Sequence, residues 1–321
     1  MTRILFTVDT ELSPALHQRG VDARENLDIA VFGRVGGGEW GIEHQMTRLE
    51  THGLKGIFFV EALCAHALGL DVLKRIVDPI LSRRHDVQLH IHTEWLAWIE
   101  RDPVAGRRGD NIADFTEPEQ RVLLELGVEA LVRAGAPRPT AFRAGNYGAD
   151  NATLRALANL GLRYDSSYNR PFLGTDCRIE AEGDLLVPTE LDGVTEVPVT
   201  FFEDFPGHAR PLQLCASSAR EFDWCIGRCI DAARPTITVV SHSFELLNVR
   251  RTRANKLLVR RFDELCAIMQ DARAPVVTFR DVDENALCSP ARRSDALKSN
   301  PARTAARMAE QALGMLLYDR A

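Results

Sequence analysis

Apolar residues along the chain fall into two kinds of segment that alternate. Short, nearly unbroken apolar runs that end at Gly, Pro or charged residues are typical of buried strands. Such runs occupy residues 3–9, 54–61, 85–92, 139–145, 163–168, 195–202, 236–246 and 275–282. Longer segments with apolar positions three and four residues apart predict amphipathic helices at residues 42–53, 70–84, 119–135, 150–162, 221–234 and 254–272. Because the two kinds alternate about seven times, we expect an α/β fold with a mostly parallel sheet, open or closed into a barrel.

Three segments depart from this alternation. Residues 13–40 are mixed in polarity and include the glycine-rich "VGGGEWG", so we expect a long loop whose place after the first strand suits a lid. Pro79 is expected to interrupt its helix, because proline removes a helical hydrogen bond. We expect one catalytic domain at residues 1–288, followed by a charged spacer and an amphipathic helix at 289–321. This tail is expected to dock on the body or on a partner subunit in a homo-oligomer.

The composition narrows the class of protein. The chain has 321 residues, of which 45% are hydrophobic and 26% charged, as in an ordinary globular protein with a sizeable core. A net charge of -6 argues against nucleic acid as a main partner. We expect neither an export signal nor a transmembrane segment, since no apolar run reaches about 18 residues. Seven cysteines without close spacing then suggest reduced thiols and a cytoplasmic location.

Polar side chains follow the apolar runs at the ends of several predicted strands. They are Asp9, Glu11, His90, His92, Glu94, Arg143, Asn146, Tyr147, Asp165 and His242. Taken singly, each has an ordinary structural role as a loop cap, an ion pair or a turn residue. The carboxyl ends of parallel strands meet at one edge of a sheet, however, and chemistry collects there. Carboxylates, histidines and an arginine that converge on one rim indicate a hydrolytic metal site.

Three of these residues form a plausible ligand set. Catalytic Zn²⁺ takes three nitrogen or oxygen ligands and leaves one position for water, whose pKa falls towards neutrality. Glu11, His90 and His92 would supply two imidazoles and one carboxylate. Asp9 lies two residues before Glu11, and its side chain points differently from that of a ligand. It is therefore a candidate for the base that receives the water's proton.

The order of these motifs resembles that of the polysaccharide deacetylase family, also called carbohydrate esterase family 4 or the NodB-homology fold. The resemblance runs from the first strand to the last predicted one, and it implies a distorted (β/α)7 barrel that removes acetyl groups from sugars with one divalent metal. "FTVDTEL" is similar to the family branch whose two acids are two residues apart, with the pattern DxE. This similarity implies that Asp9 is the catalytic base and Glu11 a metal ligand.

The second motif departs from the family pattern. The family has two metal-binding histidines four residues apart, but in "QLHIHTEW" the second histidine follows after only two. Either His92 completes the ligand set with Glu11 and His90, or Glu94 takes that position. We favour His92. The metal implied is most simply zinc, with cobalt, nickel or iron as alternatives.

The remaining motifs imply further roles. "FRAGNYG" resembles the third motif, although "AGN" replaces its usual proline. Its Arg143 would hold the base, the backbone N–H of Tyr147 would help to stabilise an oxyanion, and Asn146 would also contact substrate. "YDSSY" resembles the fourth motif, in which Asp165 would pair with the catalytic histidine. "VVSHSFEL" resembles the fifth, which makes His242 the general acid.

The resemblance thus predicts a metal-dependent hydrolase that removes acetyl groups, most simply N-acetyl, from a sugar or a polysaccharide precursor. One alternative is a metal-dependent amidase on the same scaffold that acts on a small cyclic amide or ureide. The other is a catalytically inactive sugar-binding module, which the altered histidine motif favours. Asp9, Arg143, Asp165 and His242 all stand at matching positions, which favours an active enzyme.

Overall fold

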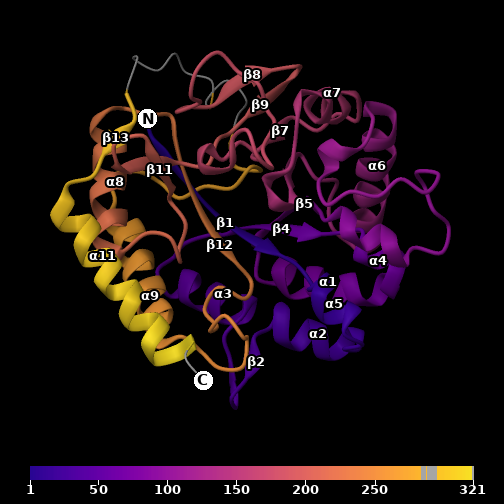
Figure 1. The fold of residues 1–321 in the computed structure, drawn as a ribbon, viewed down its shortest axis with the longest axis horizontal. Helices are drawn as coiled ribbons and strands as arrows, with labels where there is room; N and C mark the ends of the chain where they lie inside the picture. The colour runs from indigo at the N-terminus through magenta and orange to yellow at the C-terminus, as the bar shows by residue number, and fades with distance from the viewer. Residues whose placement is uncertain (283–286, 288–294, 320–321) are drawn as a thin grey trace.

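The computed structural model describes residues 1–282, 287 and 295–319, and it is built around one eight-stranded sheet (Figure 1). The strand order is β12-β1-β4-β5-β6-β7-β9-β8, and all neighbours are parallel except β8 and β9. The strands are β1 (Arg3–Thr10), β4 (Ile57–Glu61), β5 (Asp86–Ile91), β6 (Ala141–Ala144), β7 (Tyr164–Asp165), β8 (Thr189–Leu191), β9 (Val194–Glu196) and β12 (Thr236–His242). The sheet curls into an incomplete barrel with helices around it, which confirms the predicted fold class.

The strand register brings the predicted site residues to one edge of the sheet. Strand β1 lies between β12 and β4, and Asp9 pairs with His242 across the first of these contacts. Strand β5 lies between β4 and β6, and His90 pairs with Arg143. Both pairs stand at the carboxyl ends of their strands, as the sequence predicts. Seven of the eight residues of β1 are buried, because both faces of the sheet are covered.

The helices pack outside the sheet (Figure 1). They are α3 (Ile42–Thr51), α4 (Cys64–Leu68), α5 (Leu70–Ser82), α6 (Glu117–Arg133), α7 (Asn151–Asn159), α8 (Ala219–Asp231) and α9 (Lys256–Asp271). The expected interruption at Pro79 is wrong, since α5 continues through it. Pro79 lies in the last turn of the helix, where the loss of one N–H disturbs only a single hydrogen bond.

The prediction of a long loop at residues 13–40 is also wrong. This segment forms α1 (Pro14–Gln18), α2 (Ala23–Ala30) and the short hairpin β2 (Arg34–Val35) with β3 (Gly38–Glu39). The side chain of Ser13 caps α1, and Asp22 caps α2 by accepting hydrogen bonds from two backbone N–H groups. Serine before proline, and aspartate before an amphipathic stretch, are helix-start signals that outweigh the mixed polarity.

Two predicted strands near the carboxyl end of the sequence differ from the structure. The run at 195–202 divides into β9 and β10 (Phe201–Phe205), because Pro198 has no N–H with which to continue a ladder. The last predicted strand, 275–282, makes only a single bridge at Val276. Asp281 then accepts hydrogen bonds from the N–H and the hydroxyl of Thr278, so the chain turns away from the sheet. Strand β10 instead pairs with β11 (His208–Pro211) and β13 (Leu297–Lys298).

The C-terminal tail docks on the body of its own chain. Helix α11 (Pro301–Gly314), followed by a wider final turn at Met315–Asp319, lies along α9 at the left of Figure 1. The buried guanidinium of Arg307 bonds to Asp204 at 2.6 Å and to Glu221 at 3.2 Å. Much of the charged spacer expected before this helix lies outside the described residues, at 288–294. A homo-oligomer through α11 stays a prediction.

Among the residues that the structure describes, no helix is both long enough and apolar enough to cross a bilayer. The predicted cytoplasmic location stays a prediction.

The buried arginine of α11 provides a test of how the tail is anchored. We expect Arg307→Ala to lower the free energy of unfolding by about 3 kcal/mol, because it leaves the buried Glu221 without its guanidinium partner. Met308→Ala is the matched control on the same helix, since Met308 is 52% exposed, and it should change stability by less than about 0.5 kcal/mol. Urea denaturation measures both, and equal stabilities for the two variants would contradict the anchoring role.

Candidate active site

A pocket of about 350 Å³ opens at the carboxyl edge of the sheet. Most of the predicted site residues line it together. Its walls are formed by Asp9, Glu11, His90, His92, Ala144, Asn146, Tyr147, Phe172, Asp176, Gln213 and His242. Arg143 lies directly behind this wall, fully buried, whereas Asp165 lies elsewhere. The pocket is therefore assembled from the ends of β1, β5, β6 and β12.

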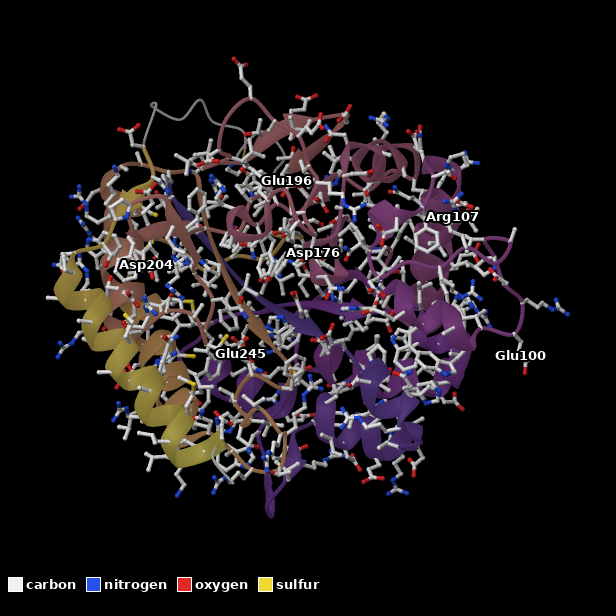
Figure 2. All side chains as sticks on the ribbon, viewed as in Figure 1. Glu100, Arg107, Asp176, Glu196, Asp204 and Glu245 are labelled. Atoms are coloured by element: carbon white, nitrogen blue, oxygen red, sulfur yellow. The ribbon has the colours of Figure 1, made fainter. Side chains whose placement is uncertain are left out.

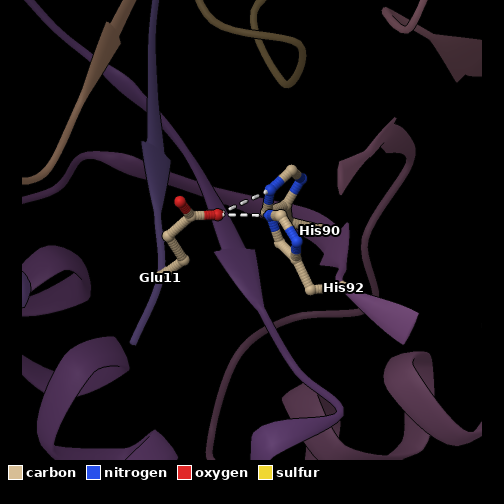
Figure 3. A group of neighbouring side chains, drawn as sticks. All are labelled: Glu11, His90 and His92. Atoms are coloured by element: carbon tan, nitrogen blue, oxygen red, sulfur yellow. Dashed lines mark hydrogen bonds and ion pairs between the residues drawn. The ribbon is translucent and has the colours of Figure 1, made fainter. Parts of the chain in front are cut away.

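Glu11, His90 and His92 form a compact cluster in this pocket (Figure 3). One ligand atom from each lies within 4.8 Å of the other two. The Nε2 atoms of His90 and His92 both face the same Glu11 oxygen, at 3.3 and 2.5 Å. Alternation along β5 would send neighbouring side chains to opposite faces, so histidines two residues apart share one face. This spacing brings both imidazoles to Glu11 without the helical turn that a four-residue spacing requires.

The other ring nitrogen of each histidine is fixed by an acceptor. The Nδ1–H of His90 donates to the carbonyl oxygen of Arg143 at 2.7 Å, which leaves Nε2 for the pocket. Nδ1 of His92 lies 3.2 Å from the carboxylate of Glu94. Carboxylates and carbonyls in these positions are typical partners of metal-binding histidines. The geometry therefore favours Glu94 as the residue that orients His92, on the side of the ring away from Glu11.

The charges of the cluster are strongly coupled. Burial raises the pKa of Glu11, but attraction to His92 and hydrogen bonds from both histidines outweigh it and hold this pKa well below its usual value. Burial lowers the pKa of His92, but the charge of Glu11 raises it well above the ordinary value. In the chain alone, an imidazolium thus balances the carboxylate. A cation that took its place would release that proton, so binding would strengthen as pH rises.

Gly145 supports His92 from behind. A Cβ atom at this glycine would lie 2.8 Å from Cγ and Nδ1 of the His92 ring, closer than atoms pack. Because Gly145 has no side chain, the backbone at the end of β6 can lie in direct contact with the His92 ring. The two residues that follow, Asn146 and Tyr147, both have left-handed backbones, with φ of 56° and 59°. These conformations turn the chain so that Tyr147 stacks on Phe172, with ring centroids 5.3 Å apart.

Asp9 is held by a fully buried guanidinium. Nη1 of Arg143 donates to Asp9 Oδ1 at 2.7 Å and to the hydroxyl of Thr7 at 2.8 Å. The other guanidinium donors reach the carbonyl oxygen and the hydroxyl of Ser166, at 3.0 and 2.9 Å. Because all three of its guanidinium nitrogens make hydrogen bonds, Arg143 fixes the Asp9 carboxylate in one orientation. Oδ2 of Asp9 then faces His242, 3.8 Å from its Nε2.

His242 is paired with a carboxylate that the sequence analysis missed. Its Nδ1 lies 2.9 Å from Glu245 Oε2, and its backbone N–H donates to the same oxygen at 2.7 Å. The other Glu245 oxygen accepts from the N–H of Cys215 at 2.8 Å and from the Gln213 amide at 3.2 Å. Burial lowers the pKa of His242, but the hydrogen bond and charge of Glu245 outweigh it and raise the pKa to about 9.

The prediction that Asp165 pairs with His242 is therefore wrong. Asp165 accepts hydrogen bonds from the hydroxyl and N–H of Ser167, at 2.7 and 3.1 Å. Its carboxyl group shares a hydrogen bond with that of Glu196 on β9, and Figure 2 shows Glu196 well apart from Glu245. Burial raises the pKa of Asp165, and burial together with the nearby Asp165 charge raises that of Glu196 well above its ordinary value. The hydroxyl of Ser167 also accepts from the N–H of Ala144, so Asp165 braces the end of β6.

Several residues at the pocket were not among the polar residues predicted at strand ends. Glu245 carries a local signal, since it follows His242 by three residues and can fold back onto it in a turn. Phe172, Asp176 and Gln213 come from the irregular segment between β7 and α8. Periodicity says nothing about where such a segment lies, so no sequence signal placed these three in the wall.

Comparisons with known proteins agree with the fold. No family model matches the sequence, and no curated protein matches it. Among solved structures, a Mycobacterium smegmatis protein described as a polysaccharide deacetylase is 18% identical, with a TM-score of 0.50 over 85% of this chain and 87% of its own. A 4-α-glucanotransferase from Thermococcus litoralis, 11% identical, also has a TM-score of 0.50, over 88% of this chain and 40% of its own. A family 4 carbohydrate esterase from Streptomyces lividans has a TM-score of 0.41 at 10% identity, over 83% of this chain and 87% of its own.

The chain therefore has the fold of polysaccharide deacetylase structures. The glucanotransferase shares that fold to the same degree, so the fold by itself does not define a reaction. The side chains of the pocket therefore carry the information about function.

The histidine cluster makes a direct prediction about metal content. We expect His92→Ala to abolish binding of zinc, because it removes one of three donors. We expect Glu94→Gln to keep the zinc but weaken its affinity by about 10- to 100-fold, the usual effect of losing a partner that orients a ligand. Elemental analysis and competition with a chromogenic chelator measure both. Zinc that survives in His92→Ala and is lost in Glu94→Gln would reverse the assignment.

The His242–Glu245 pair makes a prediction about titration. His242 should stay protonated up to about pH 9, because Glu245 stabilises the imidazolium. In Glu245→Gln this charge is gone, and only Asp9 and Glu11 still oppose the effect of burial, so the pKa of His242 should fall clearly below that of the wild type. NMR titration of the ring protons follows the change. Glu94→Gln is the matched control, since Glu94 contacts His92, and an unchanged His242 pKa in Glu245→Gln would disprove the pairing.

Proposed function

We propose that the chain is a metal-dependent hydrolase that removes an acetyl group, most simply N-acetyl, from a sugar or a saccharide precursor. One observation carries this proposal. A single pocket holds a two-histidine, one-carboxylate cluster together with a carboxylate held by arginine and a histidine held by carboxylate. Such an arrangement combines a cation site with a candidate base and a candidate acid.

The donor set fits a divalent cation. Both imidazoles present Nε2 towards one carboxylate, and both Nδ1 atoms are held by acceptors behind them. Two histidines and one carboxylate suit zinc, while cobalt, nickel and iron accept similar donors. When bound there, the cation would lower the pKa of a water molecule and polarise the amide carbonyl. Glu11, His90 and His92 would hold it.

Asp9 is suited to receive a proton from the attacking water. Arg143 holds one oxygen of Asp9, so the other oxygen faces the pocket and is available as an acceptor. Since the pair is buried, the carboxylate cannot turn away into solvent. General bases held in this way typically contribute on the order of 10²–10⁴-fold to the rate.

His242 is suited to give a proton to the departing nitrogen. Glu245 occupies Nδ1 and keeps the ring charged, while Nε2 faces the pocket beside Asp9. A proton on Nε2 is therefore available to the leaving group of a substrate that binds in the pocket next to both side chains. The acid and the base thus belong to two different strands, β12 and β1, which the sheet register fixes side by side.

The rest of the wall suits a saccharide. The stacked rings of Tyr147 and Phe172 offer an aromatic surface, and Asn146 and Asp176 offer polar groups for hydroxyls. We assign the backbone N–H of Tyr147 to the oxyanion that forms as water adds to the carbonyl. A pocket that combines polar side chains with stacked aromatic rings fits a sugar, which has hydroxyl groups on its edge and C–H groups on its faces. The fold shared with a protein described as a polysaccharide deacetylase supports the same substrate class.

The proposal is tested by acetate release from N-acetylated mono- and disaccharides and from nucleotide- or lipid-linked sugars, with zinc-loaded protein. We expect His242→Ala to lower kcat/KM by about 10²–10⁴-fold while its zinc content stays the same. His208→Ala is the matched control, because His208 is exposed and lies outside the pocket. A His242→Ala protein that lost its zinc would instead place His242 among the ligands.

The other outcomes separate the alternatives. Binding of saccharides without acetate release would indicate an inactive sugar-binding module. Hydrolysis of cyclic ureides, with no reaction of any acetylated sugar, would indicate the amidase.

A further inference from the structure

A second and larger cavity adjoins the catalytic pocket. Its volume is about 560 Å³, against about 350 Å³ for the pocket itself, and Gln213 and His242 line both. It lies between the loop after β12, helix α9 and helix α11. Apolar side chains form much of its wall: Phe244, Leu247, Leu257, Leu258 and Met315. The proposed hydrolysis of an acetyl group makes no use of this space.

Most charged groups in the wall already have partners within the chain. Arg261 donates to Glu310 at 2.8 Å and to the carbonyl oxygen of Leu214 at 2.8 Å. The guanidinium of Arg251 lies over the Phe244 ring, 3.6 Å from its centroid, while its Nη1 makes no hydrogen bond with the described residues. Two acids remain, and both are occupied, since Glu245 holds His242 and Asp319 accepts from the N–H of Val249. The wall therefore offers an occupant mainly apolar contact.

The C-terminal helix closes this cavity. Gln311, Gly314 and Met315 of the tail line it, opposite Leu257. Gly314 is buried, and a Cβ atom there would lie 3.7 Å from the Leu257 methyl group, so the missing side chain leaves the space open. At the wall's outer end, Met315 is 57% and Val249 82% exposed, which gives the cavity an apolar rim facing solvent.

We propose that this cavity binds an aliphatic chain carried by the substrate, so that the enzyme acts on an amphiphilic sugar amide. The proposal rests on the hydrolase function argued above. Because His242 and Gln213 line both spaces, a chain attached on either side of the scissile amide would start next to the cavity. The chain is thus either the acyl group itself or an aglycone on the sugar.

Three substrates distinguish these sources. N-acetylglucosamine has no chain, octyl N-acetyl-β-D-glucosaminide has it on the sugar, and N-octanoylglucosamine has it in the acyl group. We expect one octyl substrate to exceed N-acetylglucosamine in kcat/KM by at least about tenfold, since each buried methylene group contributes about fourfold. Release of the free amine by the zinc-loaded full chain measures all three.

Filling the cavity should remove this preference. In Gly314→Leu the new side chain enters the space beside Leu257, and the ratio of octyl to parent kcat/KM should fall to about threefold or less. Gly314→Ala adds only a methyl group at ordinary contact distance and should keep the ratio. Gly227→Leu is the matched control on α8, where a Cβ atom meets nothing within 4 Å. Thermal melts confirm that the variants fold.

Calorimetric titration with octyl β-D-glucopyranoside gives a readout that does not depend on catalysis. We expect binding to wild type and Gly314→Ala, and at least tenfold weaker binding to Gly314→Leu. Equal kcat/KM for parent and octyl substrates, or a preference that survives in Gly314→Leu, would overturn the inference. If no substrate reacts while the glucoside binds in a Gly314-dependent way, the chain site stands and the hydrolase function fails. If the glucoside does not bind either, both fail.

Discussion

The candidate site depends on the buried arginine at the end of β6. The guanidinium of Arg143 holds Asp9, while its own carbonyl oxygen accepts the Nδ1–H of His90. One residue therefore fixes both the orientation of the proposed base and the ring of a proposed metal ligand. It can do so because β6 lies next to β5, and because its side chain reaches across the sheet to β1. The burial of the charge is tolerated since the guanidinium makes four hydrogen bonds, one of them to the charged Asp9.

The site as a whole is a set of opposite charges held in pairs. Asp9 is neutralised by Arg143, Glu11 by His92 and His242 by Glu245. The second and third pairs shift pKa values in the direction that the proposed chemistry needs, since they favour an ionised Glu11 and a charged His242. The first pair fixes the orientation of the Asp9 carboxylate. The members of these pairs that line the pocket also lie close to one another, so each charge acts on the neighbouring pairs as well. A histidine that faces Asp9 and Glu245 together is hard to deprotonate.

The C-terminal helix extends this site without taking part in it. Arg307 anchors α11 to the body through buried carboxylates, and Gly314, two turns further on, lines the cavity that His242 also lines. The same helix thus contributes stability at one end and a cavity wall at the other. Substrate choice in this fold resides in such additions, because the strand ends that carry the chemistry have little freedom to vary.

Sequence alone determined the parallel sheet and most of the pocket. The ends of strands can be predicted because apolar runs stop at polar residues. Pattern and family resemblance therefore sufficed to name Asp9, His90, Arg143 and His242. The partner of His242 could not be named in this way. Asp165 and Glu245 are both carboxylates near a strand end, and only the path of the chain after each strand decides which of them contacts His242. Ser13 and Asp22 are local helix-start signals within 13–40, and the glycines nearby do not prevent the two helices that follow them. Only the tertiary structure decided the partner of His242 and the second cavity, since they depend on contacts between segments far apart in the chain, which local periodicity does not encode.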